Sequence, residues 1–184
     1  VTIYNVPNYG AILQAYSLAE YLRREGHEVV LFNVDSPKRH PYIYKLKRLF
    51  KLGFIDKFQQ RNYPAITSNL NEEVDIYMVG SDQVWNIEIT QADYDKYFLA
   101  FALHNRKVSY AASFGNNEWD FPSKRNEIRG FLSAFKYITV REEMGVNILK
   151  DEFNMKGNCV LDPCFLLGGN DFLFGKIIES KKIL

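Results

Sequence analysis

The chain has 184 residues, the size of one ordinary domain with a proper hydrophobic core. Its 47% hydrophobic and 24% charged residues are typical of globular proteins and exclude disorder and a coiled coil. Because 23 basic residues balance 22 acidic ones, the net charge is +1, and we expect no nucleic-acid partner. The chain has no run of about 20 apolar residues that would span a membrane, and its two cysteines predict neither a disulfide framework nor a cysteine metal site.

The first predicted elements form a β–α–β unit. Residues 1–4 are typical of a strand end, and the loop 5–9 leads into a helix predicted over 10–25, whose apolar side chains recur on one face. Gly26 ends this helix, and the sequence HEVVLFNV at 27–34 is typical of a second strand. This order predicts an α/β fold with a Rossmann-like parallel sheet flanked by helices.

The segment 36–62 interrupts the alternation of strands and helices. It is rich in Lys, Arg, Tyr and Phe and contains Pro37, Pro41 and Gly53, so we expect short basic helices outside the sheet. We favour a solvated pair of helices for this segment. The alternative is peripheral contact with a membrane, because its basic and apolar residues would suit anionic lipid.

The alternation of strands and helices then resumes. Strands are predicted at 74–79, 107–112, 136–140 and 158–161, helices at 123–135 and 142–150, and a polar loop around Asp93 and Asp95. Residues 172–184 predict a helix that leads into the start of another strand. The chain also begins without methionine in what we expect to be a strand. Because a strand is predicted to begin at the last residues, we expect one lobe over 1–180 and the start of a second lobe at 181–184.

The sequence VDIYMVGSDQVWN at 74–86 is the strongest candidate for a ligand-binding loop. An apolar run ends at Gly80, and Ser81, Asp82, Gln83 and Trp85 follow. In open α/β sheets, ligands bind just beyond such strand ends. A hydroxyl, a carboxylate, a carboxamide and an indole would suit sugar hydroxyls. The alternative is a capped turn in which the first polar side chains satisfy backbone amides.

A second candidate lies where the first strand turns into the first helix. Asn8, Tyr9 and Gly10 occupy this corner, and Gln14 follows one turn later on the polar face. A glycine lets the backbone approach a ligand, and the helix start offers free amides to an anion. A single glycine disfavours a nicotinamide or flavin site, which needs three. The alternative role of Asn8 is a simple helix cap.

Two further candidates follow later strands. Ser113 and Gly115 are small residues at a strand end, where a ligand would lie against the backbone. Arg141 and Glu142 stand where a strand turns into a helix, and a guanidinium suits bidentate binding of carboxylate or phosphate. A salt bridge from Arg141 to Glu142 or Asp162 is the alternative.

Together these segments resemble the polysaccharide pyruvyltransferase family. The resemblance rests on NYGAILQAYSL, DIYMVGSDQVWN, VSYAASFG, ITVREEMGVNIL and VLDPCFLL, in that order, and covers nearly the whole chain outside 36–62. It implies a glycosyltransferase-B-like architecture of two lobes, with this chain as the N-terminal one. The implied reaction moves a pyruvyl group from phosphoenolpyruvate to sugar hydroxyls as a ketal, on a bacterial surface polysaccharide or its lipid-linked precursor.

For this implied reaction, Arg141 would bind the donor, and Asp82 would accept hydroxyl hydrogens or act as a base. Asn8, Gln83 and Trp85 would orient the acceptor sugar. The catalytic acid is expected in the second lobe, so the chain alone should be inactive. We expect no cofactor and no metal ion, because the three histidines are scattered.

The expected location is cytoplasmic, with contact at the inner face of the membrane. A nucleotide-sugar glycosyltransferase and a non-catalytic carbohydrate-binding module stay open as alternatives. The sequence does not indicate the acceptor sugar, the linkage or the oligomeric state.

Overall fold

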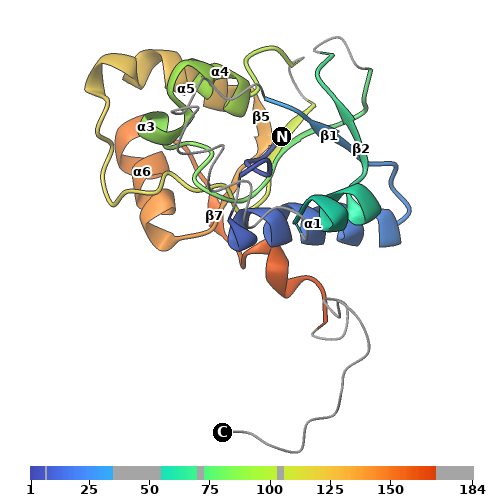
Figure 1. The fold of residues 1–184 in the computed structure, drawn as a ribbon. Helices are drawn as coiled ribbons and strands as arrows, with labels where there is room; N and C mark the ends of the chain where they lie inside the picture. Colours follow the sequence, from blue (N-terminus) through green and yellow to red (C-terminus); the bar gives the residue numbers. More distant parts are fainter. Residues whose placement is uncertain (7, 35–54, 70–72, 103–105, 169–184) are drawn as a thin grey trace, which may run out of the picture.

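The computed structural model describes residues 1–6, 8–34, 55–69, 73–102 and 106–168 (Figure 1). Most of the predicted basic segment, the predicted helix at 172–184 and the predicted second-lobe strand at 181–184 lie outside these ranges. A helix over 55–62 is the described part of the basic segment. Within the described ranges, no helix has the length and hydropathy needed to cross a membrane.

All strand pairs in the described ranges are parallel. They form three groups: β1 (Val30–Phe32) with β2 (Ala65–Thr67); β3 (Tyr77–Val79), β4 (Lys107–Ser109) and β5 (Phe135–Tyr137); and β6 (Thr139–Val140) with β7 (Asn158–Cys159). Isolated parallel bridges join Asp82 to Ala112 and Ala112 to Val140. The carboxyl ends of β3, β4 and β6 therefore lie side by side.

The segment 1–4 runs beside β3, although it is not a regular strand. The Val1 nitrogen donates to the Met78 carbonyl at 2.6 Å, and the Gly80 N–H donates to the Val1 carbonyl at 2.8 Å. Thr2 and Tyr4 of this segment are buried. The segment thus lies where a strand was predicted, and it leads directly into the first helix.

The helices lie on two sides of the strands (Figure 1). They are α1 (Tyr9–Arg24), α3 (Ile87–Thr90), α4 (Tyr94–Tyr97), α5 (Arg125–Ser133) and α6 (Glu143–Phe153), with 3-10 turns η1 (Gln91–Asp93), η2 (Pro122–Lys124) and η3 (Pro163–Phe165). The helix over 55–62 packs on α1 through Ile55, Phe58 and Ile12. Figure 1 shows α1 apart from α3, α4, α5 and α6, with strands between them. The predicted Rossmann-like α/β fold is confirmed.

Four strands, β1, β3, β4 and β7, are shorter than predicted. Apart from these and the segment 1–4, three elements differ from the sequence prediction. The strand predicted at 136–140 is divided at Ile138, because the register shifts beside β4, and β6 pairs with β7 instead. The strand β2 was not predicted, since it has three residues and no buried face. The polar loop around Asp93 and Asp95 contains α3, η1 and α4, and the Asn86 side chain caps α3 by accepting from the Glu88 N–H at 3.0 Å.

The main core is aromatic and fixes the end of the loop after β3. Trp85 and Phe98 are fully buried and stack with ring centroids 5.5 Å apart. Phe114, which follows β4, packs on the same indole at 5.1 Å. The polar residues 81–83 are therefore held between β3 and a buried aromatic anchor.

Candidate functional site

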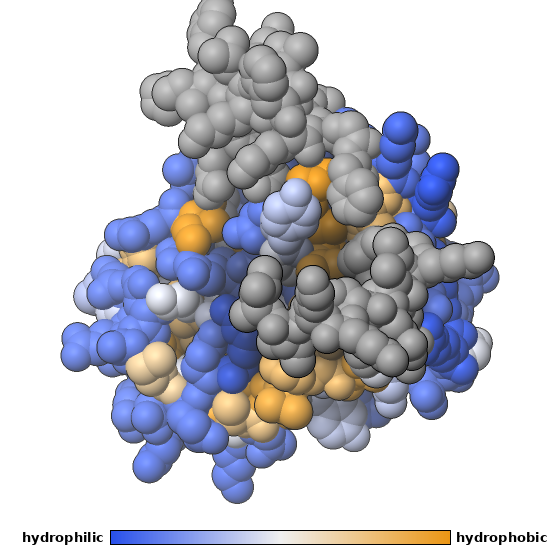
Figure 2. Space-filling view, turned by 60° about the horizontal axis from the view of Figure 1, so that its bottom comes forward, coloured by the Kyte–Doolittle hydropathy of each residue, from blue (hydrophilic) through white to orange (hydrophobic). Residues whose placement is uncertain are grey.

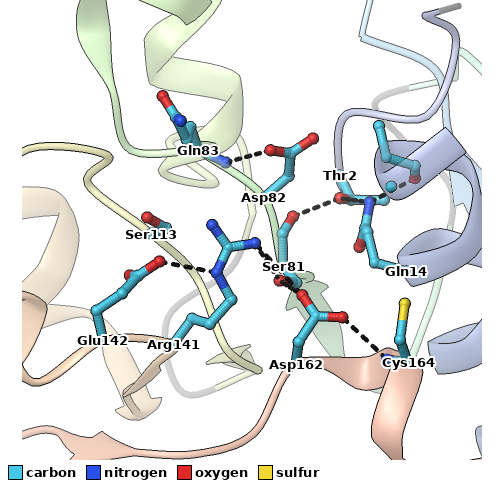
Figure 3. A network of polar contacts seen from close by, with 12 residues as sticks. Thr2, Gln14, Ser81, Asp82, Gln83, Ser113, Arg141, Glu142, Asp162 and Cys164 are labelled. Carbon is cyan, nitrogen blue, oxygen red and sulfur yellow. Dashed lines mark hydrogen bonds and ion pairs between the residues drawn. The ribbon is translucent and has the colours of Figure 1, made fainter. Parts of the chain in front are cut away.

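Polar side chains from three strand ends meet at the carboxyl edge of the strands (Figure 3). Ser81 and Asp82 follow β3, Arg141 follows β6, and Asp162 lies beyond β7. The chain after β4 connects the ends of β3 and β6, since the Ser113 N–H donates to the Asp82 carbonyl at 3.1 Å and the Arg141 N–H donates to the Ala112 carbonyl at 3.0 Å. The structure thus brings together two residues, Asp82 and Arg141, that the sequence placed in separate motifs.

Arg141 is held by carboxylates on two sides. Its Nε donates to Glu142 Oε1 at 2.8 Å, and its Nη1 donates to Asp162 Oδ2 at 3.3 Å and to Ser81 Oγ at 3.4 Å. Burial alone would lower the pKa of Arg141, but these two carboxylates outweigh it and raise the pKa. Among the described residues no hydrogen bond engages Nη2, and 29% of the side chain is exposed. The salt bridges are present, and among the described residues they leave Nη2 of the guanidinium without a hydrogen bond.

Asp82 has an unusual backbone and an unusual proton affinity. Its φ is 81°, in the left-handed region that is costly for a residue with a side chain. Burial raises the pKa of its carboxyl group, and the N–H of Gln83 at 2.8 Å and the charge of Arg141 oppose this only in part. Asp82 therefore accepts a proton more readily than an ordinary aspartate.

Asp162 is a site residue that sequence reasoning considered only as a salt-bridge partner. Its Oδ2 accepts from Ser81 Oγ at 2.8 Å and from Arg141, and its Oδ1 accepts from the Cys164 N–H at 2.9 Å, which caps η3. Burial would raise its pKa, but these donors outweigh burial and lower it. The available sequence signal was an Asp-Pro pair directly after a strand.

Asp82 and Asp162 are thus shifted in opposite directions. Pairs of titratable groups whose pKa values are pushed apart are a mark of acid–base sites. Asp162 stays ionised and binds Arg141, whereas Asp82 is able to take up and release a proton. The cluster carries one positive charge, from Arg141, against the carboxylates of Asp82, Glu142 and Asp162.

Gln14 supports the cluster from α1. It is only 2% exposed, and its Nε2 lies within hydrogen-bond distance of Thr2 Oγ1, the Ile3 carbonyl and the Ala11 carbonyl, at 2.8 to 3.0 Å. Thr2 Oγ1 in turn donates to the Ser81 carbonyl at 2.7 Å. Gln14 therefore lies beside the predicted crevice and reaches Ser81 through Thr2.

The start of α1 is capped by Asn8. Its Oδ1 accepts from the Gly10 N–H at 2.8 Å and the Ala11 N–H at 3.3 Å, so the cap foreseen as the alternative role is formed. Gly10 is exposed, and Tyr9 is 56% exposed. Because α1 packs on η3, which directly follows Asp162, this helix start belongs to the same side of the molecule.

Trp85 is placed differently from the prediction. The side chain is fully buried, and its indole N–H donates to the Tyr97 carbonyl at 3.2 Å. A side chain without exposed surface does not contact a ligand in this structure, so we assign Trp85 to the core. An aromatic residue five positions after a glycine gave no sequence signal that separates these two roles.

Gly80, Ser113 and Gly115 pack closely against neighbouring protein groups. Ser113 is fully buried, and its Oγ accepts from the Gly115 N–H at 3.0 Å. Gly115 has a φ of 75°, and a Cβ added there would lie 2.5 Å from Gln83 Oε1. At Gly80 a Cβ would meet Thr2 at 3.2 Å. Protein side chains therefore lie close to both glycines, including Gly115, where a ligand was predicted to approach.

Exposed aromatic and aliphatic groups flank the polar cluster. Leu161 and Phe165, on either side of Asp162, are 68% and 73% exposed. Figure 2 shows hydrophobic residues as a few patches on an otherwise hydrophilic face. Tyr9, at the start of α1, and Phe165, three residues after Asp162, are thus exposed aromatic residues.

Within the described ranges, the structure supports neither a reactive cysteine nor a metal site. Burial raises the pKa of the Cys164 thiol to about 12, and the pKa of Cys159 is raised as well, so neither is activated as a thiolate. Within these ranges no group of three or more His, Cys, Asp or Glu is arranged to hold a metal ion.

A cavity of about 470 Å³ lies between α1, β1 and β3, and Asp82, Arg141 and Asp162 do not line it.

Comparison with known proteins assigns the chain to a family. The sequence model of the family described as polysaccharide pyruvyl transferase matches residues 8–181. Searches of curated proteins and of solved structures gave no match. The match includes Asp82, Arg141 and Asp162 and extends over nearly the whole chain, so this chain belongs to the polysaccharide pyruvyl transferase family.

Proposed function

We propose that the protein transfers a pyruvyl group from phosphoenolpyruvate to two hydroxyls of a saccharide, forming a ketal in the synthesis of a bacterial surface polysaccharide. Family membership supports a transferase with a donor and a saccharide acceptor. The observation that carries the proposal is the carboxyl-edge cluster: Arg141 presents one free edge beside Asp82, whose pKa is raised. The reaction would take place in the cytoplasm at the inner face of the membrane, where a lipid-linked acceptor is reachable.

Arg141 is the proposed contact for the donor. Phosphoenolpyruvate carries a carboxylate and a phosphate, and the planar guanidinium suits either group. Glu142 and Asp162 already hold Arg141, so its charge is largely compensated. A second cation from outside the described residues is therefore required for the phosphate, and we place it in a second lobe that closes over this edge.

Asp82 is the proposed acid–base group for the acceptor. Ketal formation needs a proton on the enol carbon and attack of a sugar oxygen on the neighbouring carbon, after which phosphate leaves and a second hydroxyl completes the ring. Each attacking hydroxyl loses a proton: Asp82 would accept the first and pass it to the departing phosphate, and it would then be free to accept the second. Gln83 and the exposed ring of Tyr9 would orient the sugar, and the acid that protonates the enol carbon would come from the second lobe.

A donor panel tests this proposal in the intact protein. Any ligand that binds only the folded state raises the melting temperature. Phosphoenolpyruvate should raise it, and a nucleoside diphosphate should not. Protection by the nucleotide alone would indicate a glycosyltransferase, and protection by oligosaccharide alone would indicate a non-catalytic binding module. Phosphate release from phosphoenolpyruvate with a saccharide acceptor would then establish the reaction.

A further inference from the structure

Asp162 connects three parts of the candidate site. One carboxylate oxygen accepts from Ser81 at 2.8 Å and from Arg141 at 3.3 Å, and the other accepts from the Cys164 N–H at 2.9 Å. Both oxygens are therefore used by protein donors, and only 19% of the side chain is exposed. A carboxylate engaged in this way orients its neighbours and has little capacity left for a substrate.

We propose that Asp162 is a positioning residue for the pyruvyl transfer, holding the Arg141 guanidinium so that its free edge faces the substrate side of the cluster. The inference rests on the function proposed above. Figure 3 shows the unengaged guanidinium nitrogen turned away from Asp162, on the side of Gln83 and Ser113.

The geometry of the guanidinium explains why Asp162 is needed. Glu142 holds Nε and Asp162 holds Nη1, so two edges of one planar group are fixed. Loss of either partner frees the side chain to rotate, and binding then costs the entropy of ordering it again. Asp162 is itself fixed, because it caps η3 and receives the Ser81 hydroxyl.

Asp162 also acts on Asp82 through its charge. The negative charge of Asp162 is one of the influences that raise the pKa of Asp82, and that of Glu142 is not. Replacing Asp162 by asparagine keeps the size of the side chain and an acceptor oxygen but removes the charge. Glu142→Gln removes a charge from the other side of Arg141 and is the matched control.

The test compares wild type, Asp162→Asn and Glu142→Gln in the intact protein. Phosphoenolpyruvate affinity is measured by calorimetry and turnover is measured against pH. Each variant removes one negative charge, which favours an anionic donor, but it also weakens one of the two bonds that hold Arg141 in place. We expect the loss of positioning to outweigh the change in charge, so that both variants bind the donor about tenfold more weakly. If Asp82 acts as a base, turnover by the enzyme is lost as the pH falls through the pKa of Asp82. Asp162→Asn lowers this pKa, so activity should persist to lower pH, whereas Glu142→Gln should leave the acid limb in place.

An Asp162→Asn protein with wild-type donor affinity and an unmoved acid limb would overturn the inference. A second variant, Ser81→Ala, covers the case in which Asp162→Asn fails to fold. It removes the hydroxyl that donates a hydrogen bond to Asp162 and leaves the Asp162–Arg141 pair. It should weaken donor binding less than Glu142→Gln, and an equal or larger loss would also count against Asp162.

Failure of the proposed function would be seen separately, as a wild-type protein that does not bind phosphoenolpyruvate. Positioning is then measured without substrate, by nitrogen NMR of the Arg141 side chain. Rotation of the guanidinium should be faster in Asp162→Asn than in wild type. Equal rotation in both proteins would contradict the positioning role.

Discussion

At the scale of single residues, the central question is whether Arg141 forms ion pairs within the protein or binds a ligand. Arg141 was predicted either to bind the donor or to form a salt bridge, and the structure shows it bonded to Glu142 and Asp162 with one edge open. Partly buried pairs of this kind fix a side chain more than they stabilise the fold, because desolvation offsets much of the attraction. Arg141 is therefore prepared for a ligand by the same contacts that the alternative interpretation invoked.

Replacement of Arg141 should lower donor use and leave a folded protein. Arg141→Ala removes the proposed donor contact, and we expect kcat/KM for phosphoenolpyruvate to fall by about tenfold to a hundredfold, the value of one to two charge-assisted hydrogen bonds. Arg141→Lys keeps the charge without the planar fork and should recover only part of the activity. Phosphate release at subsaturating donor measures both.

Arg129→Ala is the control for this prediction, because Arg129 is an exposed arginine on α5. It should leave kcat/KM unchanged. An Arg141→Ala protein as active as this control would remove Arg141 from the donor site.

At the scale of elements, the sequence predicted what depends on local pattern. Helix α1 has the predicted buried stripe, which includes Ala11, Ala15 and Leu18, and polar strand exits follow β3 and β6 as expected. The division of 136–140 into β5 and β6 was not predictable, because it follows from the register against β4. Local pattern fixes which segments are strands, and partners decide where each one ends.

The same distinction applies to the candidate site. Asp82 and Arg141 were each predicted at the end of a strand, and parallel strands end at one edge of a sheet. The burial of Trp85 and the central place of Asp162 depend on tertiary contacts, with Tyr97 for the indole and with Ser81 for the carboxylate. No spacing along the sequence encodes these contacts.

The loop after β4 should tolerate no side chain at Gly115. Gly115→Ala places a Cβ 2.5 Å from Gln83 Oε1 and 2.8 Å from Asn86 Nδ2, at a φ of 75°. The left-handed conformation alone costs about 1 to 2 kcal/mol, so the free energy of unfolding should fall by at least that amount. Denaturant unfolding measures the change.

Gly130→Ala is the matched control, because Gly130 lies within α5 and a Cβ there meets nothing within 4 Å. Alanine favours a helix over glycine, so this variant should gain about 0.5 to 1 kcal/mol. Equal stability of the two variants would show that the lack of space for a Cβ between position 115 and Gln83 does not constrain the loop.

At the scale of the whole molecule, the described cluster is a partial site for the proposed reaction. It contains Asp82, the proposed acid–base group, and one cation in Arg141, and the carboxylates of Glu142 and Asp162 leave it net negative. A donor with a carboxylate and a phosphate requires more positive charge than this. The protonation of the enol carbon also needs an acid other than Asp82, which is assigned to the hydroxyl.

The chain by itself should therefore fold without catalysing the reaction. We expect residues 1–184, expressed alone, to melt cooperatively, because the aromatic core around Trp85 and Phe98 is contained within it. With phosphoenolpyruvate and any saccharide acceptor they should release no phosphate above the uncatalysed rate, while the intact protein does so under the same conditions. Folded residues 1–184 that release phosphate at a rate lost in Asp82→Asn would show that the required acid and second cation lie within this chain, and the division between two lobes would then be wrong.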